Sequence, residues 1–99
     1  MSERELARLR LALVERLSTP LIKDLLNDLL AERVFSNEER DSVMENRSRA
    51  GQVRLLVDMV RNKGDAASQI LLGYLRTRDP TLHRFLFPPA EQEPAAADL

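Results

Sequence analysis

The sequence predicts an all-α fold, and three observations support this. Leucine, valine and isoleucine supply most of the apolar side chains, whereas aromatic residues make up only 4% of the 99 residues. Apolar positions recur at spacings of three and four along most of the chain, as in helices that bury one face. Capping residues, prolines and glycines interrupt this pattern too often for a coiled coil. Because the connections are only two to four residues long, we expect a compact bundle of six antiparallel helices.

The first two predicted helices are rich in leucine. The first has Leu6, Leu9, Leu13 and Leu17 on one face and ends near Ser18. Thr19 then offers a capping oxygen, and Pro20 lies in a first turn, where proline is tolerated. The second helix carries a broad apolar stripe of Leu21, Ile22, Leu25, Leu26, Leu29 and Leu30. Its other side carries a row of acids four residues apart, namely Asp24, Asp28 and Glu32.

The third and fourth helices each begin at a serine. Ser36 is followed three residues later by Glu39, which is a capping box, and the short helix that it opens should bury Val43 and Met44. Residues 46–48 break the pattern, and Ser48 can cap the fourth helix. The expected core face of that helix is Val53, Leu56, Val57 and Val60. Its flank carries Arg54, Asp58 and Arg61.

Short helix-stop and helix-cap motifs mark the starts of the last two helices. Gly64 stops the fourth helix, and Asp65 is expected to cap the fifth. The fifth helix should bury Ala67, Ile70, Leu71, Tyr74 and Leu75. Asp79 is a cap followed by a first-turn proline, Pro80, and the short sixth helix that they open should bury Leu82, Phe85 and Leu86. Pro88-Pro89 ends regular structure, so we predict one domain over residues 1–87 and a disordered, acidic, proline-containing tail or linker over residues 88–99.

Composition argues against several classes of protein. The net charge is −1 and both signs are interspersed, whereas a nucleic-acid binder usually has a clear basic excess on one face. A small helical nucleic-acid binder that uses Arg47, Arg49, Arg54 and Arg61 is kept as a remote alternative. The chain has no cysteine, which excludes disulfides, zinc–thiolate sites and cysteine nucleophiles.

The chain also lacks signals for export or membrane insertion. The N-terminal segment carries a charge every few residues and has no apolar core of a signal peptide. No stretch approaches the roughly 18 apolar residues of a membrane span. Lysine and arginine are spread around the predicted bundle, which disfavours a helix lying on a membrane surface. We therefore expect a cytoplasmic protein without a membrane partner.

A search for catalytic patterns gives little. There is no glycine-rich phosphate loop and no Gly-x-Ser-x-Gly elbow. The single histidine, His83, lies beside expected packing positions, whereas a metal site usually takes three or four ligands. Asp24 and Asp28 could in principle act as acid and base or hold a divalent ion, but nothing predicts a pocket around them. We expect no enzymatic activity, no catalytic residue, no cofactor and no metal.

Charged surfaces remain as the candidate functional site. The acidic set is Asp24, Asp28, Glu32, Glu38, Glu39 and Asp41. The basic set is Arg8 and Arg10 on the first helix with Arg54 and Arg61 on the fourth. An ordinary solvated surface with weak local ion pairs would explain such charges. Complementary patches on different sides of one molecule would instead permit head-to-tail contacts, which can build a filament.

An ordered set of residues gives the chain a family resemblance. The set comprises Leu25-Leu26-x-Asp28-Leu29-Leu30, Arg33-Val34, Glu38-Glu39, Val43, Glu45-Asn46, Arg54-x-Leu56-Val57-Asp58, Lys63-Gly64, Ala67, Gln69-Ile70 and Tyr74. On these residues the chain resembles the caspase-recruitment domain of the death-fold superfamily, most of all the prodomains of inflammatory caspases. The resemblance covers nearly all of residues 6–87.

The resemblance implies a six-helix Greek-key bundle with a bent or broken first helix and no catalysis of its own. It implies that an acidic surface on the second and third helices binds a basic surface on the first and fourth helices of another such domain. Many family members polymerise into filaments that bring attached caspases together. Arg10 and Arg54 match basic positions of that surface, and Asp28 matches an acidic one. Asn27 stands where an inflammatory caspase prodomain has an interface aspartate.

The expected function is therefore homotypic binding in caspase activation, inflammasome or cell-death signalling. The expected partners are other caspase-recruitment-domain proteins, whether caspases, adaptors or sensors, and further copies of this chain. A chain that caps or blocks such assemblies while staying monomeric is the alternative, and Asn27 keeps that alternative open. The proline-bearing tail would suit a linker to a protease domain.

Overall fold

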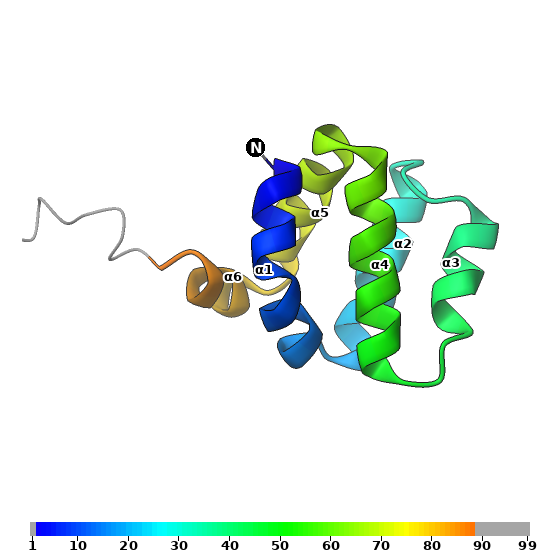
Figure 1. Ribbon diagram of the computed structural model, residues 1–99, viewed down its shortest axis with the longest axis horizontal. Helices are drawn as coiled ribbons and strands as arrows, with labels where there is room; N and C mark the ends of the chain where they lie inside the picture. Colours follow the sequence, from blue (N-terminus) through cyan, green and yellow to red (C-terminus); the bar gives the residue numbers. More distant parts are fainter. Residues whose placement is uncertain (1, 89–99) are drawn as a thin grey trace, which may run out of the picture.

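The computed structural model describes residues 2–88, and all regular structure in this range is helical (Figure 1). The helices are α1 (Ser2–Arg16), α2 (Thr19–Ala31), α3 (Asn37–Met44), α4 (Arg49–Lys63), α5 (Asp65–Arg78) and α6 (Pro80–Leu86). The predicted all-α fold of six helices is confirmed. Apart from Pro88, the predicted tail over residues 88–99 lies outside the described residues.

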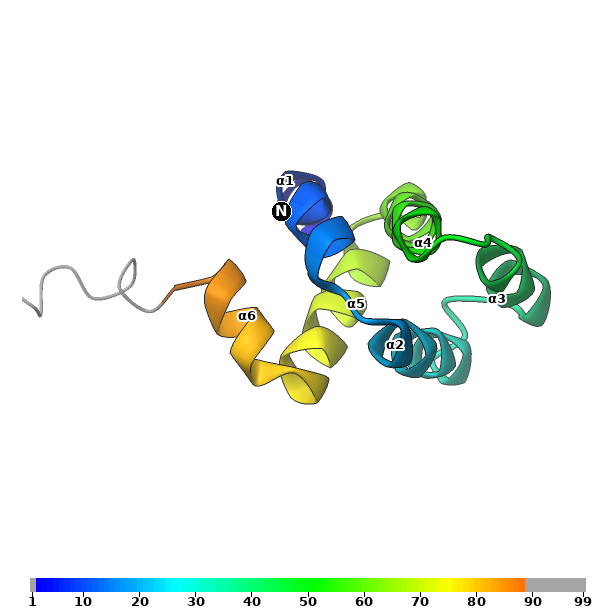
Figure 2. The same ribbon diagram turned by 90° about the horizontal axis from the view of Figure 1, so that it is seen from below.

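The helices form a Greek-key bundle around α1, α4 and α5, which pack on one another. α2 packs mainly on α5, α3 packs mainly on α4, and α6 packs on α5 and the edge of α1. From α1 to α5, neighbours in sequence run in opposite directions, whereas α6 lies across them, and α3 and α6 lie at opposite ends of the molecule (Figure 1). α1 is unbroken from Ser2 to Arg16. Figure 2 shows its last turns leaning away from its first turns, so the expected first helix is bent and not broken.

The core is aliphatic, as the scarcity of aromatic residues requires. The side chains with almost no exposed surface come from every helix except α6. They are Leu6, Leu13, Ile22, Leu25, Leu26, Leu29, Val43, Val53, Leu56, Val57, Val60 and Leu75. Met44, Ile70 and Tyr74 were expected in the core and are only half-buried against it. Leu30 is half-buried as well, and Phe35 is a core residue that the helical pattern did not predict.

The prediction that Phe85 is buried is wrong. Its side chain is 52% exposed, because the two-turn α6 uses Leu82 and Leu86 to contact the bundle. The Arg16 guanidinium covers the ring instead, with its carbon 3.8 Å from the ring centroid. A cation over an aromatic face is a favourable contact, and it joins the end of α1 to α6.

Three of the predicted caps are confirmed. The Ser36 hydroxyl accepts a hydrogen bond from the Glu39 amide at 3.1 Å, and the Glu39 carboxylate accepts one from the Ser36 amide at 2.8 Å. The Ser48 hydroxyl accepts from the amide of Gly51 at 2.9 Å. Asp79 caps α6 by accepting from the amide of Leu82 at 3.0 Å. These bonds satisfy backbone donors that the first helical turn leaves without partners.

The other two caps are corrected. Ser18, and not Thr19, caps α2, through the Leu21 amide at 3.3 Å. Gly64, and not Asp65, is the cap residue between α4 and α5, and its φ of +108° suits glycine because it has no Cβ. Asp65 is already the first residue of α5, and its carboxylate accepts from the Glu3 amide of α1 at 2.8 Å. A residue expected to cap its own helix therefore caps another one.

Replacing Leu56 by alanine should lower the free energy of unfolding by about 2–5 kcal/mol, because truncation of this buried side chain leaves a cavity at the centre of the bundle. Urea denaturation followed by circular dichroism measures this change. Leu11→Ala is the matched control, since the same atoms are removed from a side chain that is 69% exposed. The control should change stability by no more than about 0.5 kcal/mol. Equal losses in the two variants would contradict the core assigned to Leu56.

Candidate protein-interaction surfaces

The acidic row on α2 is bound to α5. Arg78 of α5 donates from Nε and Nη2 to the two carboxylate oxygens of Asp28, with 2.8 Å for the second bond. Its Nη1 lies 3.7 Å from the carboxylate of Asp24. The Tyr74 hydroxyl of α5 donates to the carboxylate of Glu32. The Asp28 side chain is only 12% exposed, so it stabilises the contact between α2 and α5, whereas Asp24 and Glu32 are bound to α5 and remain exposed.

These contacts also raise the pKa values of the two α5 side chains, Arg78 and Tyr74. The hydrogen bond with Asp28 raises the pKa of Arg78, so the guanidinium keeps its charge at all physiological pH values. The hydrogen bond to Glu32 raises the pKa of Tyr74, so its phenol remains a donor. Asp28 is therefore poorly placed to meet a cation of a partner, because its side chain is only 12% exposed and already accepts two bonds from Arg78.

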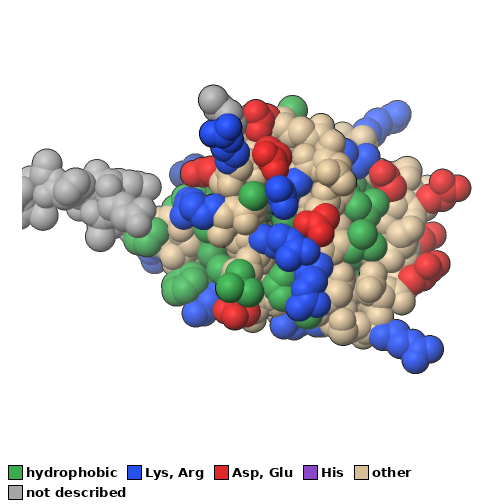
Figure 3. Space-filling model, in the orientation of Figure 1, with side chains coloured by type: hydrophobic (Ala, Val, Ile, Leu, Met, Phe, Trp, Pro, Cys, Tyr) green, Lys and Arg blue, Asp and Glu red, His purple; other side chains and the backbone are tan. Residues whose placement is uncertain are grey.

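Three of the predicted acidic residues lie on α3. Glu38 and Asp41 are exposed, and Asp41 has a contact of 3.3 Å with its neighbour Arg40. Glu39 is half-buried, with its carboxylate 2.8 Å from the Lys63 ammonium at the end of α4. The Lys63 contact and the capping bond with Ser36 lower the pKa of Glu39. In Figure 3 acidic side chains gather at the α3 end of the molecule.

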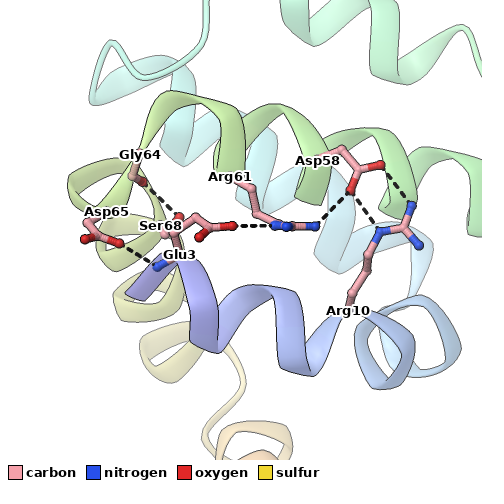
Figure 4. Close-up of polar contacts among 7 residues, drawn as sticks. All are labelled: Glu3, Arg10, Asp58, Arg61, Gly64, Asp65 and Ser68. Atoms are coloured by element: carbon pink, nitrogen blue, oxygen red, sulfur yellow. Dashed lines mark hydrogen bonds and ion pairs between the residues drawn. The ribbon is translucent and has the colours of Figure 1, made fainter. Parts of the chain in front are cut away.

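Two of the predicted basic residues are bound to acids of the same chain. Arg10 donates from Nε and Nη2 to the Asp58 carboxylate, at 2.9 Å each. Arg61 donates from Nε to the Glu3 carboxylate at 2.8 Å, and its Nη1 lies 3.9 Å from Asp58. Figure 4 shows these four side chains as one line of alternating charge between α1 and α4. The Arg10 hydrogen bond, with a smaller contribution from the charge of Arg61, lowers the pKa of Asp58.

The other two basic residues are more available. The Arg8 side chain is 61% exposed and has a long contact of 3.6 Å with Glu5 in its own helix. Arg54 is exposed, and no ion pair or side-chain hydrogen bond involves it within residues 2–88. Figure 3 shows lysine and arginine side chains spread over α1 and α4, with acidic side chains among them. Arg54 is therefore the member of the basic set that is best placed to meet a partner.

The surface has shallow hollows at both predicted faces. One of about 530 Å³ is lined by Arg10, Asp58, Arg61 and Asn62. Another of about 230 Å³ lies between α2 and α3, and is lined by Lys23, Leu26, Asn27, Arg40, Asp41 and Met44. Asn27 is exposed there, in a lining that also holds two cations, Lys23 and Arg40, and one acid, Asp41. The two hollows suit contact between folded surfaces better than the enclosure of a small molecule.

Several other features bear on function. Among residues 2–88, no three potential ligands from His, Cys, Asp and Glu come together as a metal site would need. Across the same residues, no helix has the length and apolar content to cross a bilayer. His83 is half-buried and stacks on Phe87, with ring centroids 4.7 Å apart. Burial, and then the charge of Arg76, lower the pKa of His83, so its ring is neutral at physiological pH.

Sequence reasoning did not predict the contacts that three residues make in these networks. Glu3, Asp65 and Arg78 each bind a side chain or amide more than 40 positions away in the chain. The spacing of Arg54, Asp58 and Arg61 did indicate a shared flank of α4, but not that Arg10 would bind Asp58. Only the packing of α1 on α4 reveals that contact.

The caspase recruitment domain (CARD) family model matches residues 3–88, and the chain belongs to this family. Caspase-1 of Equus caballus is 34% identical over 83 residues, which cover 83% of this chain and 20% of that protein. An inhibitor of apoptosis protein of Gallus gallus is 36% identical over 78 residues, which cover 79% of this chain and 12% of that protein. Caspase recruitment domain-containing protein 8 of Homo sapiens is 32% identical over 65 residues, which cover 66% of this chain and 12% of that protein.

The family resemblance expected from the sequence is thus confirmed, and the chain is a module of a family whose domains bind one another. It spans about a fifth or less of the length of these relatives, so the greater part of each lies beyond the matched region. No solved structure gives a significant match.

The stability of the domain should fall as the pH is lowered from about 5 to about 3, in part because of Glu39. The native pKa of Glu39 lies below its ordinary value, so the stabilisation is complete above the unfolded pKa of about 4.3 and is lost as the pH falls through the native pKa. Glu39→Gln keeps a capping side chain but loses the charge that attracts Lys63. The difference in melting temperature between wild type and Glu39→Gln should therefore shrink on acidification.

Glu38→Gln is the matched control, because Glu38 is the exposed neighbour of Glu39 and pairs with no cation in the described part of the chain. Its melting temperature should follow that of the wild type in parallel. A difference for Glu39→Gln that stays constant from pH 7 to about pH 3 would contradict the role given to the Lys63 contact.

Proposed function

We propose that this chain is a homotypic interaction module that recruits or assembles CARD proteins in caspase activation, inflammasome or cell-death signalling. Its partners are CARD-bearing caspases, adaptors or sensors and further copies of itself, in the cytoplasm. Membership of the CARD family supports this proposal, as does the similarity to caspase-1. The proposal includes service as the prodomain of a larger protein, since the caspase-1 relative is several times longer than the region it shares with this chain.

The observation that carries the proposed contact is the separation of available charges. Arg54 is exposed on α4, whereas Glu38 and Asp41 are exposed on α3. The two helices pack side by side, but α3 extends to the end of the molecule (Figure 1). We place Arg54 at the centre of the basic surface, with Arg8, Arg10 and Arg61 around it, and the acidic surface of the next copy on α3. A contact between two different surfaces can repeat from copy to copy without closing.

The structure favours α3 over α2 as the source of the acidic surface. Asp24 and Asp28 are bound to Arg78, and Glu32 is bound to Tyr74. These three remain in the proposed acidic surface, but at its edge. Each exposed ion pair contributes little to affinity, whereas the complementary charge of the whole surface speeds encounter and selects partners.

A monomeric regulator of other CARD proteins is the second candidate, and one observation favours it. With the α2 acids bound to α5 and Asn27 uncharged, the acidic surface is smaller than the sequence predicts. Such a chain would bind a partner through Arg54, but its acidic surface would be too small to bind the basic surface of the next copy. It would stay monomeric at every concentration and still bind a second CARD protein.

Nucleic-acid binding is less well supported than it was from the sequence. Arg49 donates to the carbonyl oxygens of Val14 and Leu17, and Arg61 is bound to Glu3. Two of the four arginines that would bind phosphate are therefore occupied within the protein. We expect that the purified chain will not shift the mobility of duplex DNA or RNA at low salt.

The purified chain should assemble as its concentration rises, and the assemblies should dissolve as salt is added, because exposed charges make the contacts. Light scattering across a concentration series at low and moderate salt measures this, with negative-stain microscopy at the highest concentration. Arg54→Glu should abolish assembly while the helical circular dichroism signal is unchanged.

Arg76→Glu supplies the control for that variant. It makes the same charge change at an exposed arginine on α5, outside the proposed basic surface, and should assemble like the wild type. Normal assembly by Arg54→Glu would show that the basic surface is wrongly assigned. A wild-type chain that never assembles, yet binds a second CARD protein through Arg54, would support the regulator instead.

A further inference from the structure

The basic surface of this chain already contains its own acids. Arg10 binds Asp58 through two hydrogen bonds, and Arg61 binds Glu3 and lies near Asp58 (Figure 4). We call Asp58 and Glu3 the internal acids. The two arginines and the two internal acids sum to no net charge. A partner's carboxylate that approaches this part of the surface therefore meets guanidinium groups whose donors are partly in use.

The geometry at Arg10 is the one that a bound partner would be expected to use. A carboxylate that bonds both Nε and Nη2 of a guanidinium forms the strongest common contact between these groups. Asp58 takes both of these donors at 2.9 Å. A second carboxylate can reach Arg10 only through the remaining N–H groups, two on Nη1 and one on Nη2, or after Asp58 has moved away.

The contacts of the internal acids are nevertheless replaceable. All four side chains are half-buried, and Arg10, Asp58 and Arg61 line the open hollow between α1 and α4. Ion pairs at this degree of exposure are weak and are screened by salt. Each also joins different helices, so neither pair is needed to form a helix. Several carboxylates arriving together could displace the internal acids, whereas a single one would gain little.

We propose that Asp58, assisted by Glu3, is a specificity-determining residue that occupies the basic surface of the free chain. It restricts binding at Arg10 and Arg61 to partners that present several carboxylates on one surface. Arg54, which has no such acid, makes the first contact. This inference rests on the proposed function in its choice of surface, but it makes a separate prediction about Asp58: removing the charge of this acid strengthens binding.

The test titrates the full-length chain with polyglutamate peptide at low salt, followed by NMR signals of the arginine Nε–H groups. Asp58→Asn should bind the peptide about two- to fivefold more tightly than the wild type, as expected for release of one exposed ion pair. The Arg10 Nε–H signal should shift more in the variant than in the wild type. In light scattering, the concentration at which assembly begins should fall by a similar factor.

Asp65→Asn is the matched control. It removes one negative charge from the same network, but Asp65 contacts the Glu3 amide and not an arginine (Figure 4). Its affinity for polyglutamate should equal that of the wild type, which excludes a general effect of net charge. In an Arg10→Gln background, Asp58→Asn should bring at most a small further gain, because the arginine that it releases is gone.

The outcomes separate this inference from the proposed function. Weaker or unchanged binding of polyglutamate by Asp58→Asn overturns the inference, because Asp58 then acts as a direct contact or as a support for Arg10. An equal gain from Asp65→Asn also overturns it. Tighter binding of polyglutamate by Asp58→Asn would uphold the inference even if the wild type and the variant both stayed monomeric at all concentrations. That second result would remove self-assembly from the proposed function.

Discussion

The packing of α1 against α4 and α5 is the contact on which the rest of the structure depends. Leu6 and Leu13 are fully buried in it, opposite core residues of the other two helices. Groups from those helices also bind both ends of α1. Asp65 accepts from the Glu3 amide, and Arg49 donates to carbonyl oxygens in the last turn. Because the proposed basic surface takes its residues from α1 and α4, this packing sets the positions of its arginines.

The same packing determines how much charge that surface shows. Side chains at the rim of a helix contact meet those of the neighbouring helix, and here they meet as opposite charges. Arg54 is exposed and stays available. The contact of α2 with α5 binds Asp24 and Asp28 to Arg78, whereas Glu38 and Asp41 of α3 stay at the surface. A count of charges in the sequence therefore overstates what a partner meets.

The sequence predicted the six helices, most of the core and the capping residues Ser36, Ser48 and Asp79, because these follow from spacing and local hydrogen bonds. It failed where two local signals compete or a helix is short. Ser18 and Thr19 are adjacent capping types, and seven residues of α6 cannot fix which face is buried, so Phe85 was misplaced. The Arg10–Asp58 and Arg78–Asp28 pairs join residues about 50 positions apart, and local patterns carry no information on such contacts.

The attachment of α3 has a consequence for the motions of the domain. This helix has eight residues and contributes one fully buried side chain, Val43, to the core. Its capping box and the contact of Glu39 with Lys63 are at its first turn, and the rest is held mainly by α4. Such a segment opens at a lower free energy than the bundle as a whole. The backbone amides of α3 will therefore exchange with solvent sooner than those of α4, and the acidic surface can adjust its shape while the basic surface stays rigid.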